Sequence, residues 1–139
     1  MSRQSTPFAQ TYITIAAALA RPAGGETEAA LETAHRALQF ADRSRFRLEQ
    51  GAAHRVLAQA HAAAGHRAEA DAAFRQSLEI LENIRSWPEL GQTLLAYGQF
   101  QLGADPAHGR RLIERARAIF EDIGAPGWLA EAEAAPGGR

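Results

Sequence analysis

An internal repeat with a period of 40 residues restricts the fold of this chain more than any other feature of its sequence. When residues 15–42 are aligned without gaps on 55–82, the matches include Ala18 with Ala58, Gly25 with Gly65, Ala30 with Ala70 and Leu38 with Leu78. A third copy follows 39 residues later, with Ile113 on Phe74 and Phe120 on Leu81. Such a repeat indicates a stacked array of helical units, because one unit alone cannot bury its apolar face.

Composition excludes several classes of protein. The net charge is −1 and the sequence pI is near 6.5, so no global field attracts nucleic acid or an anionic membrane. The absence of cysteine excludes a disulfide framework, a thiol nucleophile and a cysteine-ligated zinc site. No apolar run is long enough to span a bilayer, and the first residues lack the apolar core of a secretory signal. We therefore expect a cytoplasmic protein that binds neither nucleic acid nor a membrane.

Apolar residues at helical spacing, separated by Gly and Pro breaks, predict an all-α fold without strands. The predicted helices cover about 7–21, 26–41, 45–64, 67–85, 86–102, 106–123 and 126–135. They form one domain, 1–135, with repeats at about 7–42, 45–85 and 86–123 and a terminal helix at 126–135. Residues 136–139 are expected to be a disordered tail.

Three helix starts carry capping residues. Ser86 and Glu89 have the spacing of a capping box, with Pro88 between them in the first turn. Asp105 precedes a proline that fits the first helical position, so its carboxylate is expected to accept a backbone N–H. Ser44 is the candidate cap of the helix predicted to begin near residue 45.

The middle repeat resembles the tetratricopeptide repeat, a helix–turn–helix unit. Leu57-Ala58 stands at the family's Leu-Gly pair, Gly65 at its turn, and Ala70 and Phe74 at the small and aromatic positions of its second helix. The other two copies match at fewer positions, and all three are longer than the standard form of about 34 residues. The stretch 116–130 is also similar to the last repeats of bacterial signalling ATPases and maltose-activator-type transcriptional regulators, although this chain contains neither their ATPase motifs nor their DNA-binding or cyclase domains.

This resemblance implies a right-handed solenoid of three tetratricopeptide-like repeats with a terminal capping helix, and a concave groove lined by the first helix of each pair. On the family's pattern, the groove residues are Tyr12, Ile15, Leu19, Arg55, Gln59, Thr93, Tyr97, Phe100 and Gln101. A peptide or a short amphipathic helix of a partner would bind there. The alternative for Tyr12, Ile15, Leu19 and Phe100 is packing against neighbouring helices.

No set of residues has the spacing of a catalytic or metal site. His54 and His61 lie two helical turns apart, which is too far to grip one metal ion, and no loop has the glycine pattern of a phosphate site. We expect no enzymatic activity, no cofactor and no metal. The sequence instead favours a scaffold that binds a protein or peptide partner, or that forms a homodimer through its ends.

Two questions stay open from the sequence. Trp128 either covers Ile119, Phe120 and Ile123 as a cap, or it leaves an apolar end open for association. The alternative function is a small-molecule sensing domain of a signalling ATPase or transcriptional regulator, with a pocket formed by Tyr12, Arg55 and Tyr97.

Overall fold

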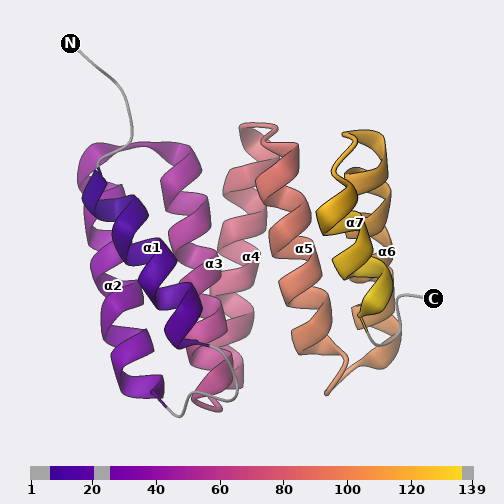
Figure 1. Ribbon diagram of the computed structural model, residues 1–139. Coiled ribbons are helices and arrows are strands. Elements are labelled where there is room, and N and C mark those ends of the chain that lie inside the picture. The colour runs from indigo at the N-terminus through magenta and orange to yellow at the C-terminus, as the bar shows by residue number, and fades with distance from the viewer. Residues whose placement is uncertain (1–6, 21–25, 136–139) are drawn as a thin grey trace. The chain divides into compact units, whose positions relative to one another are not determined.

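Helices account for all regular secondary structure in the computed structural model, which describes residues 7–20 and 26–135 (Figure 1). The predicted all-α class is therefore confirmed for this part of the chain. The predicted tail at 136–139 and the break at 22–25 lie outside the described residues. The helices are α1 (Pro7–Leu19), α2 (Thr27–Ser44), α3 (Arg47–Ala63), α4 (Arg67–Asn83), α5 (Trp87–Gln101), α6 (Pro106–Asp122) and α7 (Pro126–Ala134).

The chain divides into two compact units. Unit 1, Met1–Ile84, contains α1 to α4, and unit 2, Arg85–Arg139, contains α5 to α7. The single domain 1–135 stays a prediction from the sequence, and each unit is described by itself below. The first two predicted helix pairs belong to unit 1, and the third pair with the terminal helix belongs to unit 2.

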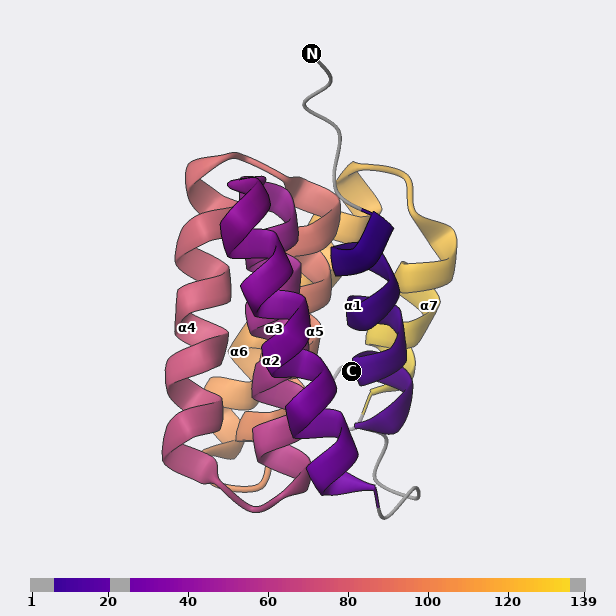
Figure 2. The ribbon, with the colours of Figure 1, turned by 90° about the vertical axis from the view of Figure 1, so that its left-hand side faces the viewer.

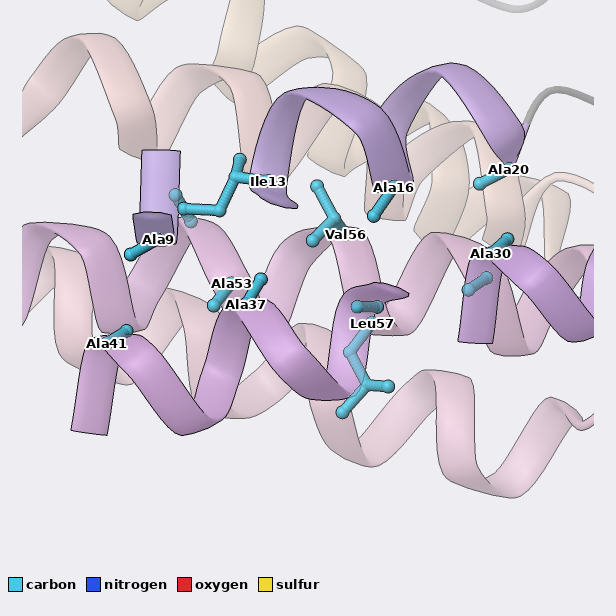
Figure 3. Packing of buried hydrophobic residues seen from close by; sticks show 13 residues of the cluster. Ala9, Ile13, Ala16, Ala20, Ala30, Ala37, Ala41, Ala53, Val56 and Leu57 are labelled. Atoms are coloured by element: carbon cyan, nitrogen blue, oxygen red, sulfur yellow. The ribbon is translucent and has the colours of Figure 1, made fainter. Parts of the chain in front are cut away.

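Alanines hold α1 against α2 in unit 1. One stripe of α1 is buried, and it faces Val56 of α3 and a stripe of buried alanines on α2. The buried stripe of α1 consists of Ala9, Ile13, Ala16 and Ala20. The buried stripe of α2 consists of Ala30, Ala34, Ala37 and Ala41. Figure 3 shows Ala9 near Ala41 at one end of this pair and Ala20 near Ala30 at the other, so the two helices run antiparallel. Such small side chains let helix backbones approach closely.

The helices α3 and α4 are neighbours in the ribbon (Figure 2), and they pack tightly through Gly51 of α3. A Cβ atom at Gly51 would lie 2.5 Å from Cδ2 of Leu81, so only glycine fits there without movement of that side chain. Beside this contact, the buried Ser77 hydroxyl donates to the Gly51 carbonyl at 2.8 Å. Both contacts fix the spacing of the second helix pair.

Unit 2 is built around a buried aromatic ring. Phe120 of α6 is fully buried, and its ring occupies the space that a side chain at Gly91 of α5 would need. Trp128 of α7 stacks on Phe120 with 5.7 Å between ring centroids, while 40% of its surface stays exposed. Trp128 therefore contacts Phe120, one of the three residues named in the cap prediction, while its cover of Ile119 and Ile123 stays a prediction.

Only one of the three predicted caps forms. The Asp105 carboxylate accepts from the His108 N–H at 3.2 Å at the start of α6. Ser86 holds the N-cap position of α5, but its side chain makes no capping hydrogen bond, so the bond predicted for Ser86 does not form. Ser44 instead ends α2, because its hydroxyl donates to the Ala41 carbonyl at 2.9 Å and α3 starts later, at Arg47.

The difference between the two caps gives a matched stability test. Asp105→Ala is expected to lower the free energy of unfolding by about 1 kcal/mol, because the His108 N–H loses its acceptor and a negative charge leaves the helix N-terminus. Ser86→Ala is expected to change it by only a few tenths, since no capping bond is removed. Urea unfolding of both variants measures the difference, and equal losses would contradict this assignment.

Candidate functional site

One side of α1 presents apolar side chains to solvent. Phe8, Tyr12, Ile15 and Leu19 are spaced 4, 3 and 4 residues apart, which places them on one helical stripe beside the buried stripe. Phe8 is 61% exposed and Ile15 43%, while Tyr12 and Leu19 are half-buried. These four residues are called the α1 face below. The helix from Pro7 to Leu19 contains no charged residue, so the α1 face has no charge from its own helix.

Two residues of α2 extend the α1 face at its Phe8 end. The Phe40 ring stacks on Phe8 and on Tyr12, with centroids 5.4 Å apart in both pairs. The Arg43 guanidinium lies 5.5 Å from the centroid of the Phe40 ring, in the arrangement of a cation–π contact. Sequence reasoning missed both residues, because nothing in their local spacing indicates that α2 returns beside Phe8.

The predicted groove residues have different environments. Tyr12, Ile15 and Leu19 lie together on the α1 face, and Arg55 and Gln59 are half-buried on α3 of the same unit. The remaining four belong to unit 2, where Phe100 and Gln101 are half-buried. Of the three residues predicted to form a small-molecule pocket, Tyr12 and Arg55 therefore belong to unit 1 and Tyr97 to unit 2.

Thr93 and Tyr97 differ from the prediction that they line an open groove. Their side chains are 0% and 2% exposed. The Tyr97 ring meets His108, at the start of α6, edge to face at 5.8 Å, and it stacks on Phe100 at 6.4 Å. Its hydroxyl accepts from Gln101 Nε2 at 3.3 Å. The family pattern fails here because Tyr97 packs into the interior of the structure, and Thr93, one turn earlier, follows the same side of α5.

Three histidines meet at one end of unit 1. The Nδ1 atoms of His61 and His66 lie 3.1 Å apart, and the His35 ring stands edge-on to His61 at 6.2 Å between centroids. The sequence singled out His54 with His61, but His35 comes from α2 and could not be placed by spacing along α3. Among the residues that the structure describes, no group of three His, Asp or Glu side chains is arranged to hold a metal ion.

The environment of these histidines lowers two pKa values. Burial lowers the pKa of His61, nearby His66 and His35 lower it further, and Glu69 partly opposes them. Burial also lowers the pKa of His54, with Asp42 opposing and Arg47 reinforcing the effect. Both imidazoles therefore take up protons less readily in the folded chain than in the unfolded chain.

Acidification is expected to destabilise the fold through these groups. Because their folded-state pKa values lie below the ordinary value of 6.5, the unfolded chain binds more protons as the pH falls through that value. The urea midpoint should therefore drop between about pH 7.5 and about pH 5.5, and His61→Gln should reduce that drop. A His61→Gln variant with the pH dependence of the wild type would contradict a contribution from His61.

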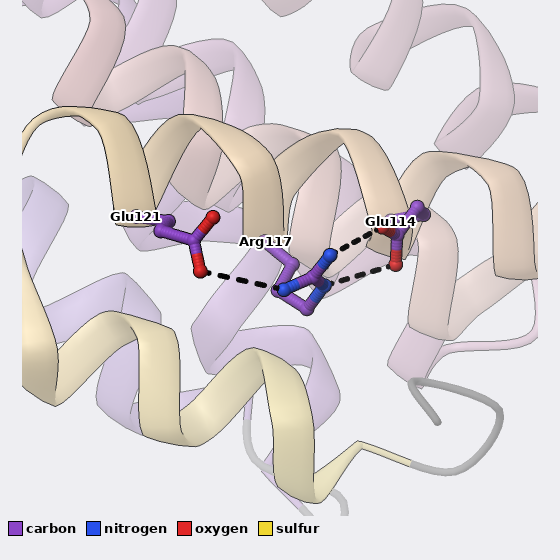
Figure 4. A network of polar contacts seen from close by, with 3 residues as sticks. All are labelled: Glu114, Arg117 and Glu121. Atoms are coloured by element: carbon purple, nitrogen blue, oxygen red, sulfur yellow. Dashed lines mark hydrogen bonds and ion pairs between the residues drawn. The ribbon is translucent and has the colours of Figure 1, made fainter.

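A network of polar contacts lies on the surface of α6 in unit 2 (Figure 4). The Arg117 guanidinium donates to both carboxylate oxygens of Glu114, at 3.0 and 2.6 Å, and lies 3.8 Å from Glu121. These bonds lower the pKa of Glu114 and raise that of Arg117. The predicted pairing of Glu114 with Arg117 is confirmed. Since both carboxylates are largely exposed, the network contributes little to stability.

None of the helices in the described ranges combines the length and the apolar character needed to cross a bilayer. Comparisons of the chain with protein-family models, with curated proteins and with solved structures found no match. The α1 face, extended by Phe40 and Arg43, is therefore the candidate site on its own chemistry: it is exposed, apolar and free of charge along α1, with one cation at its edge.

Proposed function

We propose that this chain is a non-catalytic protein-interaction module that binds a helix or peptide of a protein partner at the α1 face. The observation that carries this proposal is the exposed, uncharged stripe of Phe8, Tyr12, Ile15 and Leu19. Apolar side chains gathered on a surface are typical of sites that another protein covers. The tetratricopeptide-like solenoid and the cytoplasmic location are parts of the same proposal.

The chemistry of the α1 face defines the partner. Its side chains span about three turns, so an amphipathic helix with apolar residues at i, i+3 or i+4 and i+7 would match it. The rings of Phe8 and Tyr12 are held by Phe40, which lowers the entropy that binding would cost. Arg43 favours a carboxylate on the partner at the Phe8 end.

A selection from a displayed library of helical peptides tests this function. We expect the wild-type chain to enrich amphipathic sequences, and Ile15→Glu to lose them by at least about tenfold in affinity, because a charge at the middle of the face would be buried on binding. Thr14→Glu is the matched control: Thr14 is exposed on another side of α1 and should retain binding. Peptides bound equally by both variants would contradict the assignment to the α1 face.

The rival function has a distinct outcome in a parallel thermal-shift screen. If small metabolites raised the melting temperature while no peptide was enriched, a small-molecule sensing domain of a signalling ATPase or transcriptional regulator would replace the proposal. Ligands that bind the folded state alone raise its apparent stability with concentration, so the screen reads binding directly.

A further inference from the structure

We propose that the α1 face binds a second copy of this chain, with the two α1 helices packed antiparallel about a twofold axis. This inference rests on the proposed function, since it names the partner of the same face. Two independent features of unit 1 support it: the spacing of the apolar residues along α1, and the distribution of charge along α2.

The spacing along the α1 face reads the same in both directions. The intervals between Phe8, Tyr12, Ile15 and Leu19 are 4, 3 and 4, so a twofold axis between Tyr12 and Ile15 matches every member with another. Phe8 meets the partner's Leu19, and Tyr12 meets the partner's Ile15. Each layer then pairs a ring with a branched aliphatic side chain, which is the self-complementarity that a twofold interface requires. A foreign helix would need no such symmetry.

The second feature is the charge on α2. Since α1 and α2 run antiparallel, Arg43 lies at the Phe8 end of the α1 face and Glu32 lies toward its Leu19 end. Residues 32 and 43 are separated by about three helical turns and so share one face of α2. Glu32 pairs with Arg36 at 3.6 Å in a largely exposed contact, which can be exchanged at little cost.

Antiparallel packing brings Arg43 of one copy toward the partner's Glu32, and the twofold axis repeats this pair on the other side. Parallel packing would place the two Arg43 residues together and the two Glu32 residues together. Like charges at an interface oppose association, and opposite charges fix its register. The uncharged α1 helices meet without any charge to desolvate. The charges on α2 therefore favour the antiparallel orientation, which the spacing along α1 allows.

Light scattering or sedimentation equilibrium of the full chain across a concentration series tests the dimer. We expect a monomer–dimer equilibrium in the wild type. Ile15→Arg should raise the dissociation constant by at least about tenfold, since two arginines then lie close to the twofold axis. Thr14→Arg adds the same charge to the neighbouring residue on another side of α1 and should leave the dimer intact. Circular dichroism and urea midpoints show whether both variants fold.

Disulfide trapping tests the orientation, and the chain has no cysteine of its own. A mixture of Phe8→Cys and Leu19→Cys chains should form a cross-linked heterodimer. Neither variant alone should cross-link, because the two copies of residue 8 would lie about 16 Å apart along the helix axis. Efficient trapping of Phe8→Cys with itself would overturn the antiparallel arrangement.

A charge exchange tests the contribution of α2. Arg43→Glu and Glu32→Arg should each weaken the dimer several-fold, and the double variant should recover it, because the pairs re-form with their signs reversed. No recovery would overturn the proposed pairing of Arg43 with the partner's Glu32.

The outcomes separate this inference from the proposed function. The wild-type chain could stay monomeric to millimolar concentration and still select peptides that Ile15→Glu does not bind. That result would overturn the binding of a second copy and would support the proposed binding of a partner helix or peptide at the α1 face. A dimer that survives Ile15→Arg, in a chain that selects no such peptide, overturns both.

Discussion

Phe120→Ala is expected to lower the free energy of unfolding by about 3–5 kcal/mol, the range for deleting a fully buried aromatic ring. The ring touches all three helices of unit 2: it belongs to α6, lies against Gly91 of α5 and stacks on Trp128 of α7. The backbone at Gly91 cannot extend a side chain into the space, so a cavity remains. Urea unfolding followed by far-UV circular dichroism measures the loss.

Trp128→Ala is the comparison for this prediction. Because Trp128 is 40% exposed, its removal should cost less, about 1–2 kcal/mol for the lost stacking and burial. A loss equal to that of Phe120→Ala would mean that α7 is as essential to the interior as α6. No loss from either variant would contradict the core of unit 2 described above.

Gly98→Ala is expected to destabilise the protein by about 1–3 kcal/mol, although alanine is by itself the better helix former by about 1 kcal/mol. A Cβ atom at Gly98 would lie 2.6 Å from Cγ1 of Ile113 and 2.9 Å from the Gly109 carbonyl oxygen. A side chain could move aside, but a backbone carbonyl cannot move without shifting α6. The clash therefore outweighs the gain in helix propensity.

Gly103→Ala provides the control for this substitution. The nearest atom to a Cβ at Gly103 is the Phe100 carbonyl oxygen at 3.8 Å, an ordinary contact, so stability should stay within about 0.5 kcal/mol. Chemical denaturation of the two variants side by side gives the difference. If Gly98→Ala were as stable as Gly103→Ala, α6 would be able to move away from α5 at little cost in free energy.

Much of the secondary structure could be predicted, because helix signals are local. Apolar spacing and the Gly and Pro breaks place all seven helices within a few residues of their observed bounds. Asp105 caps α6 as predicted, whereas Ser86 does not cap α5. A cap depends on the rotamer that one side chain adopts, and its spacing in sequence does not determine that rotamer.

Some residues of the predicted groove are exposed to solvent as expected, and others are buried. Ile15 is exposed and Tyr12 and Leu19 are half-buried, and their contact with a partner stays a prediction. Thr93 and Tyr97 were expected in the same kind of open face, but both are buried. A repeat alignment treats equivalent positions alike, while the burial of each depends on the neighbours that its own helix meets.

Helix pairs could be predicted from the apolar periodicity and the breaks, because both are properties of consecutive residues. Which distant residues meet depends on how the helices pack together. Phe40 and Arg43 complete the α1 face because α2 runs back along α1, and His35 joins His61 and His66 at a corner of three helices. Such contacts depend on the axial register of neighbouring helices, which is fixed by close packing of small residues and is invisible in the pattern of any one helix.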